Sequence, residues 1–149
     1  MNYRATILGI LVIALTSLIP SKGVAQNDNK NTAENQMKVQ IGSKTFTATL
    51  YDNATATAFK AMLPLTLDMS DVNRNEKYFK FSKNLPTNDS NPGAIHTGDL
   101  MIWSSRGLVL FYKSFSTSSS YTKIGRINDP SGLADAVGSG NVTVRFELK

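Results

Sequence analysis

The sequence of 149 residues contains no cysteine, one histidine and one tryptophan. Without cysteine, the chain cannot form disulfides, thiolate metal sites or a lipid-modified lipoprotein terminus. One histidine and dispersed carboxylates provide no cluster of metal ligands, so no metal and no other cofactor is expected. Long runs of basic residues, which mark proteins that follow nucleic-acid phosphates, are missing as well. We therefore expect no nucleic-acid partner, although the formal net charge is +5.

Residues 1–25 have the layout of a secretory signal peptide. Arg4 supplies a positive charge, residues 5–19 (ATILGILVIALTSLI) are apolar, and residues 23–25 (GVA) place small side chains before a cut at Gln26. A retained membrane anchor is the alternative, but this apolar stretch is shorter than the roughly 20 residues of a spanning helix. We predict an exported protein, periplasmic or extracellular, with no stable membrane insertion after cleavage. Export without disulfides favours a bacterial source.

The mature chain is predicted to be one domain that follows a short linker. Residues 26–36 (QNDNKNTAENQ) hold no large apolar side chain and are predicted to be a disordered polar linker. In residues 37–149, apolar and polar residues alternate over short stretches, as they do in half-buried strands. The predicted strands cover residues 37–41, 44–50, 65–72, 77–82, 99–103, 108–112, 121–127 and 141–148.

Two short helices complete the predicted domain. Residues 52–53 (DN) are a helix start for residues 54–63, and residues 129–130 (DP) begin a second helix that runs to Val137. Eight strands with one apolar face each and only two helices predict a mainly β fold. A closed or nearly closed barrel is expected, because closure removes exposed strand edges.

Several stretches of this domain resemble the cyclophilins, and more closely the small bacterial cyclophilin-like domains. The stretch LVLFYKSFSTSSSYTKIGRI, from Leu108, is similar to the Phe-rich strand, polar loop and aromatic-initiated strand of their C-terminal half. Hallmarks of the smaller family are LPLT at 63–66, NEKY at 75–78, GDL at 98–100 and GSG at 138–140. The resemblance covers residues 37–149 and implies a closed eight-stranded barrel with two short helices.

The resemblance also implies a ligand groove on the outer face of the barrel. Its border in this sequence would be formed by Phe111, Phe115, Ser120 and Tyr121. Prolyl isomerases of this fold carry an Arg followed by Phe-Met-x-Gln, with a Trp and a His near the groove. This chain has no Phe-Met-x-Gln, and Tyr121 stands about where the His is expected. Arg74 is the candidate to replace the catalytic Arg. The resemblance therefore implies the fold, and isomerase activity stays an open alternative.

Three carboxylates lie close together in the sequence, at Asp68, Asp71 and Glu76. Two neighbouring acids can perform acid–base chemistry if burial raises one pKa. The alternation favours an outer barrel face for Asp68 and a turn for Asp71. We therefore interpret both as surface or capping residues, and Glu76 as either structural or ligand-orienting.

A Ser-His-Asp arrangement is the remaining catalytic possibility. His96 is followed by Asp99, and serines are plentiful, but the chain has no Gly-x-Ser-x-Gly elbow and His96 lies in a predicted loop. We assign no catalytic residue and lean against an enzyme.

Aromatic residues gather in the central strands, and about half of them must face outward from a barrel. An outward aromatic patch is costly to leave in water unless it binds a ligand, although plain packing is the alternative. We predict a secreted, non-catalytic module that binds a peptide or a small molecule. The alternatives are a degenerate peptidyl-prolyl isomerase and a purely structural accessory domain; the oligomeric state does not follow from the sequence.

Overall fold

The computed structural model describes residues 32–149. The predicted signal peptide and most of the predicted linker lie outside the described residues. Residues 32–34 are helical, and the first barrel strand begins at Gln36, one residue before the predicted start of the domain. No helix within residues 32–149 is long and apolar enough to cross a membrane.

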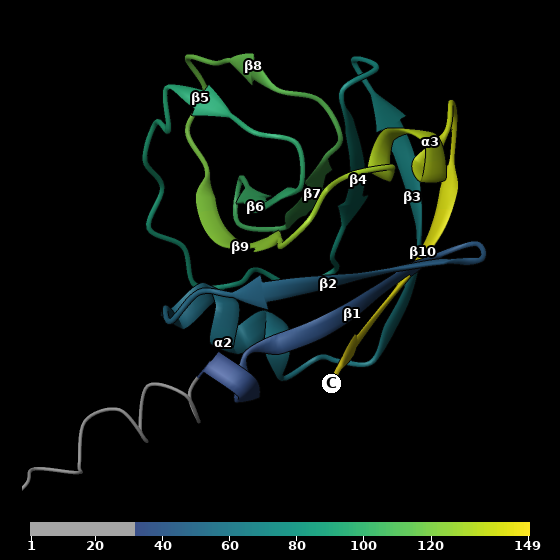
Figure 1. Ribbon diagram of the computed structural model, residues 1–149. Coiled ribbons are helices and arrows are strands. Elements are labelled where there is room, and N and C mark those ends of the chain that lie inside the picture. Colours follow the sequence, from purple (N-terminus) through teal and green to yellow (C-terminus); the bar gives the residue numbers. More distant parts are fainter. Residues whose placement is uncertain (1–31) are drawn as a thin grey trace, which may run out of the picture.

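Eight strands form the wall of the molecule. They are β1 Gln36–Ile41, β2 Lys44–Leu50, β3 Leu65–Val72, β4 Glu76–Lys80, β6 Asp99–Trp103, β7 Gly107–Phe111, β9 Thr122–Ile127 and β10 Val142–Leu148. Every pair is antiparallel, and the strands close in the order β1-β10-β3-β4-β7-β6-β9-β2 (Figure 1). This confirms the predicted mainly β fold and the closed eight-stranded barrel.

Two further strands, β5 Ala94–Ile95 and β8 Phe115–Ser116, pair with each other outside the barrel. In Figure 1 this small ribbon lies beside β6, β7 and β9. This ribbon was not predicted, because two residues are too few to show an alternating pattern. The polar serine stretch therefore begins as one strand of a covering ribbon.

The first barrel helix, α2, spans Ala54–Lys60 and is capped as predicted. The side chain of Asn53 accepts a hydrogen bond of 2.8 Å from the backbone N–H of Ala56. The helix ends at Lys60, short of the predicted 63. The next backbone N–H groups, of Met62 and Leu63, donate to residues three positions back, so the chain leaves the helix in a tighter turn before Pro64.

The second helix, α3, spans Leu133–Val137 and also begins later than predicted. Gly132 has a φ of 80°, in the left-handed region, so the helix starts only after it. Gly138, with a φ of 57°, ends the helix. Figure 1 shows α2 and α3 at opposite ends of the barrel. Phe59 of α2 and Leu133 and Val137 of α3 belong to the hydrophobic cluster in its interior.

The barrel wall separates two hydrophobic clusters. The larger one fills the interior, where for example Phe59 of α2 packs edge-on against Phe146 with ring centroids 5.8 Å apart. The smaller one lies on the outer face and contains Ile95, Met101, Val109, Phe111 and Tyr121. β7 is therefore buried on both faces. As predicted, some aromatic residues lie in the core and others on the outer face, but the β5–β8 ribbon covers several of the outer ones.

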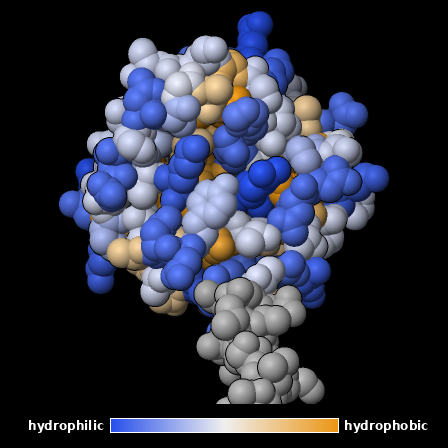
Figure 2. All heavy atoms as spheres, turned by 60° about the vertical axis from the view of Figure 1, so that its left-hand side comes forward, coloured by the Kyte–Doolittle hydropathy of each residue, from blue (hydrophilic) through white to orange (hydrophobic). Residues whose placement is uncertain are grey.

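The surface outside this covered region is broken up. Figure 2 shows one face of the molecule, on which hydrophobic surface occurs as small patches between hydrophilic side chains. Among the described residues, the large apolar side chains that stay exposed are Trp103, at 48%, and Leu148, at 42%. Leu148 is near the chain end, whereas Trp103 lies beside the outer cluster.

Candidate functional site

A groove of about 520 Å³ opens on the outer face of the barrel, beside the outer cluster. Its apolar walls are aromatic and come from Tyr78 of β4, Trp103 of β6, Phe115 of β8 and Tyr121 just before β9. The rings of Tyr78 and Trp103 meet edge-on, with centroids 6.4 Å apart. A Cβ at Gly107 would collide with the Tyr78 ring, so only glycine lets this tyrosine lie across β7.

The opposite wall is held in place by the covering segments. Tyr121 exchanges two backbone hydrogen bonds with Ser90, of 2.9 and 3.0 Å, which fix the loop 82–93 against the start of β9. Phe115 pairs with Ile95 across the small ribbon. The rings of Phe115 and Tyr121 both contact the ring of Phe111, with centroid distances of 5.7 Å and 5.6 Å.

The polar end of the groove comes from the turn between β3 and β4. Asn73 and Arg74 both have positive φ, 53° and 55°, and the backbone N–H of Asn75 donates to the Val72 carbonyl at 3.2 Å. The Asn75 carbonyl in turn accepts from Tyr112 at 3.0 Å. Asn73, Asn75 and the next residue, Glu76, therefore reach the groove from a fixed backbone.

Glu76 is a half-buried carboxyl in this polar end. Burial raises its pKa above the usual value, and the nearby charge of Asp71 raises it further. Within residues 32–149, no group donates a hydrogen bond to the Glu76 carboxyl and no cation pairs with it. Beside it, the Oδ1 atom of Asn75 is buried without a hydrogen-bond partner. Native structures leave few buried polar atoms unpaired, so this oxygen is unusual.

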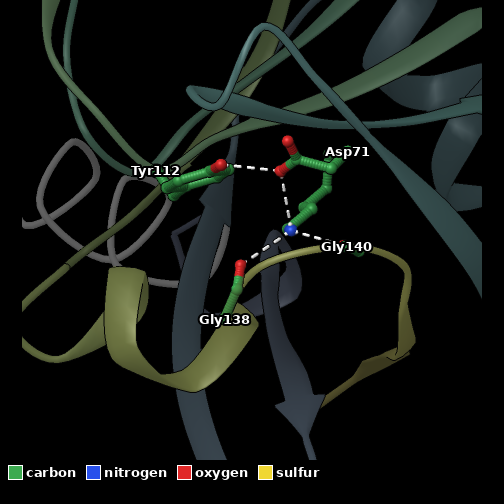
Figure 3. Close-up of polar contacts among 5 residues, drawn as sticks. Asp71, Tyr112, Gly138 and Gly140 are labelled. Carbon is green, nitrogen blue, oxygen red and sulfur yellow. Dashed lines mark hydrogen bonds and ion pairs between the residues drawn. The ribbon is translucent and has the colours of Figure 1, made fainter.

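The opposite face of β4 carries a polar cluster that is fully paired. Lys77 is 0% exposed, and its Nζ donates to Asp71 Oδ1 at 2.8 Å and to the carbonyls of Gly138 and Gly140 at 2.8 and 2.6 Å (Figure 3). Tyr112 donates its hydroxyl to the same Asp71 oxygen at 2.6 Å. We call these five residues the Lys77 network.

The pKa values in the Lys77 network follow from these contacts. The hydrogen bond from Lys77, and then that from Tyr112, lower the pKa of Asp71 below its usual value. Burial, and then the hydrogen bond to Asp71, raise the pKa of Tyr112 to about 12. The network joins β3, β4 and the loop after α3 at one end of the barrel, so its role is structural.

Residues 39–147 match the family model described as the cyclophilin-like family. This chain belongs to the cyclophilin-like family. Its fold is similar to the solution structure of a hypothetical protein from Archaeoglobus fulgidus, with a TM-score of 0.54 and 21% sequence identity, over 79% of this chain and 97% of that chain. At this identity the likeness shows the fold alone. No curated protein matches the chain.

The structure of this cyclophilin-like domain brings together only some of the predicted groove residues. Glu76, Phe115 and Tyr121 line the groove. Phe111 is 0% exposed and lies beneath the ribbon, so it supports the groove without bordering it. Ser120 is exposed in the loop before Tyr121, outside the residues that line the groove. Ligand binding by these residues stays a prediction.

Arg74 lies on the other side of the hairpin. It borders a separate cavity with Asp71, Tyr112 and Lys113. No arginine, lysine or histidine is among the described residues that line the groove beside Tyr121. The cyclophilin-like domain therefore does not place the candidate stand-in for a catalytic Arg next to the aromatic walls.

Asp71 does more than cap the turn. A backbone hydrogen bond from Arg74 reaches it, as a turn cap requires, but Asp71 also lies within β3 on the same inward face as Leu67 and Met69, and its side chain is 18% exposed. Asp68 does face outward, and accepts a hydrogen bond of 2.6 Å from Thr143. The inward turn of Asp71 follows from Lys77, whose buried Nζ needs an acceptor at this end of the barrel.

The prediction missed three residues of the groove and the Lys77 network, and the sequence held a signal for two of them. Lys77 lies on the same face of its strand as Phe79, which packs against the interior cluster, so the alternation predicts an inward lysine. Trp103 lies on the same face as Met101, which belongs to the outer cluster. Asn75 carried no such signal, because a turn residue does not follow the alternation of a strand.

His96 and Asp99 form a local loop contact. The Asp99 carboxylate accepts from the His96 backbone N–H at 2.8 Å, and the exposed imidazole lies 3.8 Å from it. In the described part of the chain, no serine hydroxyl bonds the imidazole, and no group of three His, Cys, Asp or Glu side chains is placed to hold a metal ion. The arrangement offers loop stabilisation and no catalytic geometry.

Proposed function

We propose that this cyclophilin-like domain is an exported, non-catalytic binding module that takes a small molecule or a peptide side chain in the groove between Trp103 and Tyr121. The observation that carries the proposal is the groove itself. Its volume of about 520 Å³ lies within the range of small-ligand sites, and aromatic walls surround a few convergent polar groups. Apolar walls supply burial, and the polar end supplies orientation.

The position of Arg74 supports binding over prolyl isomerisation. In the isomerases that this fold resembles, an arginine donates to the twisted amide while apolar residues hold the proline ring. Tyr121 and Phe115 can supply an apolar surface, but Arg74 borders the other cavity and the groove lining contains no basic side chain. A proline ring held here would lack the donor that stabilises the twisted amide.

An isomerisation assay on the full chain separates the two functions. We expect the rate for a proline-containing peptide to equal the uncatalysed rate. A clear acceleration that is lost in Tyr121→Ala would instead establish the degenerate isomerase. Arg74→Ala is the second variant, and loss of the acceleration in it would show that a turn arginine acts from outside the groove.

Binding is tested with the fluorescence of Trp103, which is the only tryptophan in the chain and lines the groove. A panel of aromatic and aliphatic compounds, charged and neutral, is titrated into the full chain. We expect at least one class to change the emission saturably and to lose this effect in Phe115→Ala. A panel without any saturable change would contradict the binding function.

Export rests on residues 1–25. N-terminal sequencing of the protein recovered outside the cytoplasm is expected to begin at Gln26. Recovery in the cytoplasm with Met1 in place would contradict export.

A further inference from the structure

The carboxyl of Glu76 differs from the other carboxyls around the barrel end. Asp71 is paired with Lys77 and Tyr112, and Asp68 with Thr143. Glu76 lines the groove and has no donor or cation among the residues of the described chain. Burial nevertheless holds it partly away from water, and its pKa is raised for that reason. An isolated, partly desolvated carboxylate is stabilised most by a cation that arrives with its own donors.

Asn75, the preceding residue, is not among the described donors to Glu76. Its side-chain Oδ1 is buried without a partner, its backbone N–H donates to the Val72 carbonyl, and its backbone carbonyl accepts from the Tyr112 backbone N–H. A ligand group with several N–H donors can pair with the Glu76 carboxyl. A ligand with acceptors only would leave that carboxyl unpaired and would be repelled by its charge.

The remaining walls also favour a positive ligand. Trp103 is half exposed at the rim, and Tyr78 packs edge-on against it, so the groove presents aromatic rings at which a cation is attracted. The described lining residues include no Lys or Arg that would repel it. Arg74 of the β3–β4 turn and Lys113, which follows β7, border the separate cavity. The local charge of the groove is thus opposite to the net charge of the chain.

We propose that the groove selects a small organic cation that has N–H donors, namely a primary ammonium or guanidinium group on an apolar or aromatic body. The cationic group pairs with the Glu76 carboxyl. The body lies between Trp103, Tyr78 and Tyr121. This inference rests on the proposed binding function and specifies the ligand chemistry for it.

Three compounds of nearly equal size test the proposal. Phenethylamine is the cation, phenethyl alcohol is its neutral counterpart, and phenylacetate is the anion. Each is titrated into the full chain at neutral pH, with the emission of Trp103 as the readout. We expect phenethylamine to bind at least about tenfold more tightly than either of the others, since a hydrogen-bonded charge pair contributes more than a neutral contact.

Glu76→Gln keeps the shape of the side chain and removes the charge. It is expected to weaken the binding of phenethylamine about tenfold and to leave the affinity for phenethyl alcohol unchanged. The matched control is Glu147→Gln, which removes the same charge from β10 outside the groove. It should leave the affinity for all three compounds unchanged.

Three results would overturn the proposal. The first is that phenethyl alcohol or phenylacetate binds as tightly as phenethylamine, and the second is that Glu76→Gln leaves the affinity for phenethylamine unchanged. In both cases the groove binds ligands without selecting cations, and the binding function survives. If none of the three compounds changes the emission, the cation proposal fails, and the binding function is decided by the broader panel of compounds.

Discussion

Two adjacent residues of β4 carry charges in opposite situations. Lys77 points into the barrel, where its Nζ has three acceptors, the full number that an ammonium group can serve. Glu76 points outward into the groove and has no partner within the described residues. Both lose solvent on folding, but only one is compensated inside the molecule. Removing one partner of a paired buried charge is costly for the fold, whereas an unpaired charge beside a cavity is available to a ligand.

The acceptors explain why the lysine is tied to the fold. Two of them are backbone carbonyls, of Gly138 and Gly140, in the loop between α3 and β10. Backbone groups cannot move away without disturbing that loop. The lysine therefore fixes the loop against β4, while the Tyr112 hydroxyl supports the Asp71 side of the same network.

The largest effect is expected on removing the lysine. Lys77→Met keeps most of the stem and deletes the charge, which leaves Asp71 and two carbonyls without their donor. We expect a loss of about 3–5 kcal/mol in the free energy of unfolding, measured by urea denaturation. Lys80→Met, on the outward face of the same strand, is the matched control and should change stability by no more than about 0.5 kcal/mol. Equal effects of the two variants would refute a structural role for the network.

A smaller effect is expected for Asp71→Asn, together with a change in pH dependence. The amide keeps an acceptor but loses the charge, so a loss of about 1.5–3 kcal/mol is expected at neutral pH. The lowered pKa of Asp71 means that its contribution is present above the unfolded pKa, about 3.9, and is lost as the pH falls through the lower folded value.

The variant should therefore lose less stability than the wild type as the solution is acidified below about pH 4. Asp68→Asn, on the outer face of β3, is the control, with a small effect at every pH. Parallel acid profiles for the wild type and Asp71→Asn would contradict the pairing of Asp71 with Lys77.

The smallest effect on stability is expected for Glu76→Gln. Because burial raises the pKa of Glu76, its carboxylate makes folding less favourable as the pH rises through that value. Replacing it at neutral pH should leave stability unchanged, or raise it by about 0.5 kcal/mol. Urea denaturation beside Lys77→Met measures the contrast directly. A loss above about 2 kcal/mol would mean that Glu76, like Lys77, supports the fold, and the contrast between the two residues would be wrong.

The sequence predicted the barrel well because each strand presents its alternation locally. Residues 65–72 and 141–148 matched β3 and β10 within one residue. The Lys77 network was less accessible, because its acceptors lie 61 and 63 residues further along the chain. The alternation alone predicts that the lysine points inward, but it does not identify the acceptors of its hydrogen bonds.

The groove was predicted in part, and the errors have physical causes. The resemblance located Phe115 and Tyr121. Trp103 was not assigned to the groove, although it shares a face of its strand with Met101, which lies in the outer cluster. Phe111 was misplaced because the short β5–β8 ribbon, invisible in the sequence pattern, covers it. Arg74 was misplaced because the side of a hairpin that a turn residue occupies depends on its backbone dihedrals, here a φ of 55°, and a sequence pattern does not specify them.

The outer groove, and not the cavity beside the Lys77 network, is the proposed site for an organic cation. An NMR titration of the isotope-labelled full chain with phenethylamine distinguishes these two places. We expect saturable shifts at Asn75, Glu76, Trp103 and Tyr121, with Gly138 and Gly140 unaffected. Shifts confined to Arg74, Gly138 and Gly140, or the absence of any saturable shift, would show that the groove is not the site for this cation.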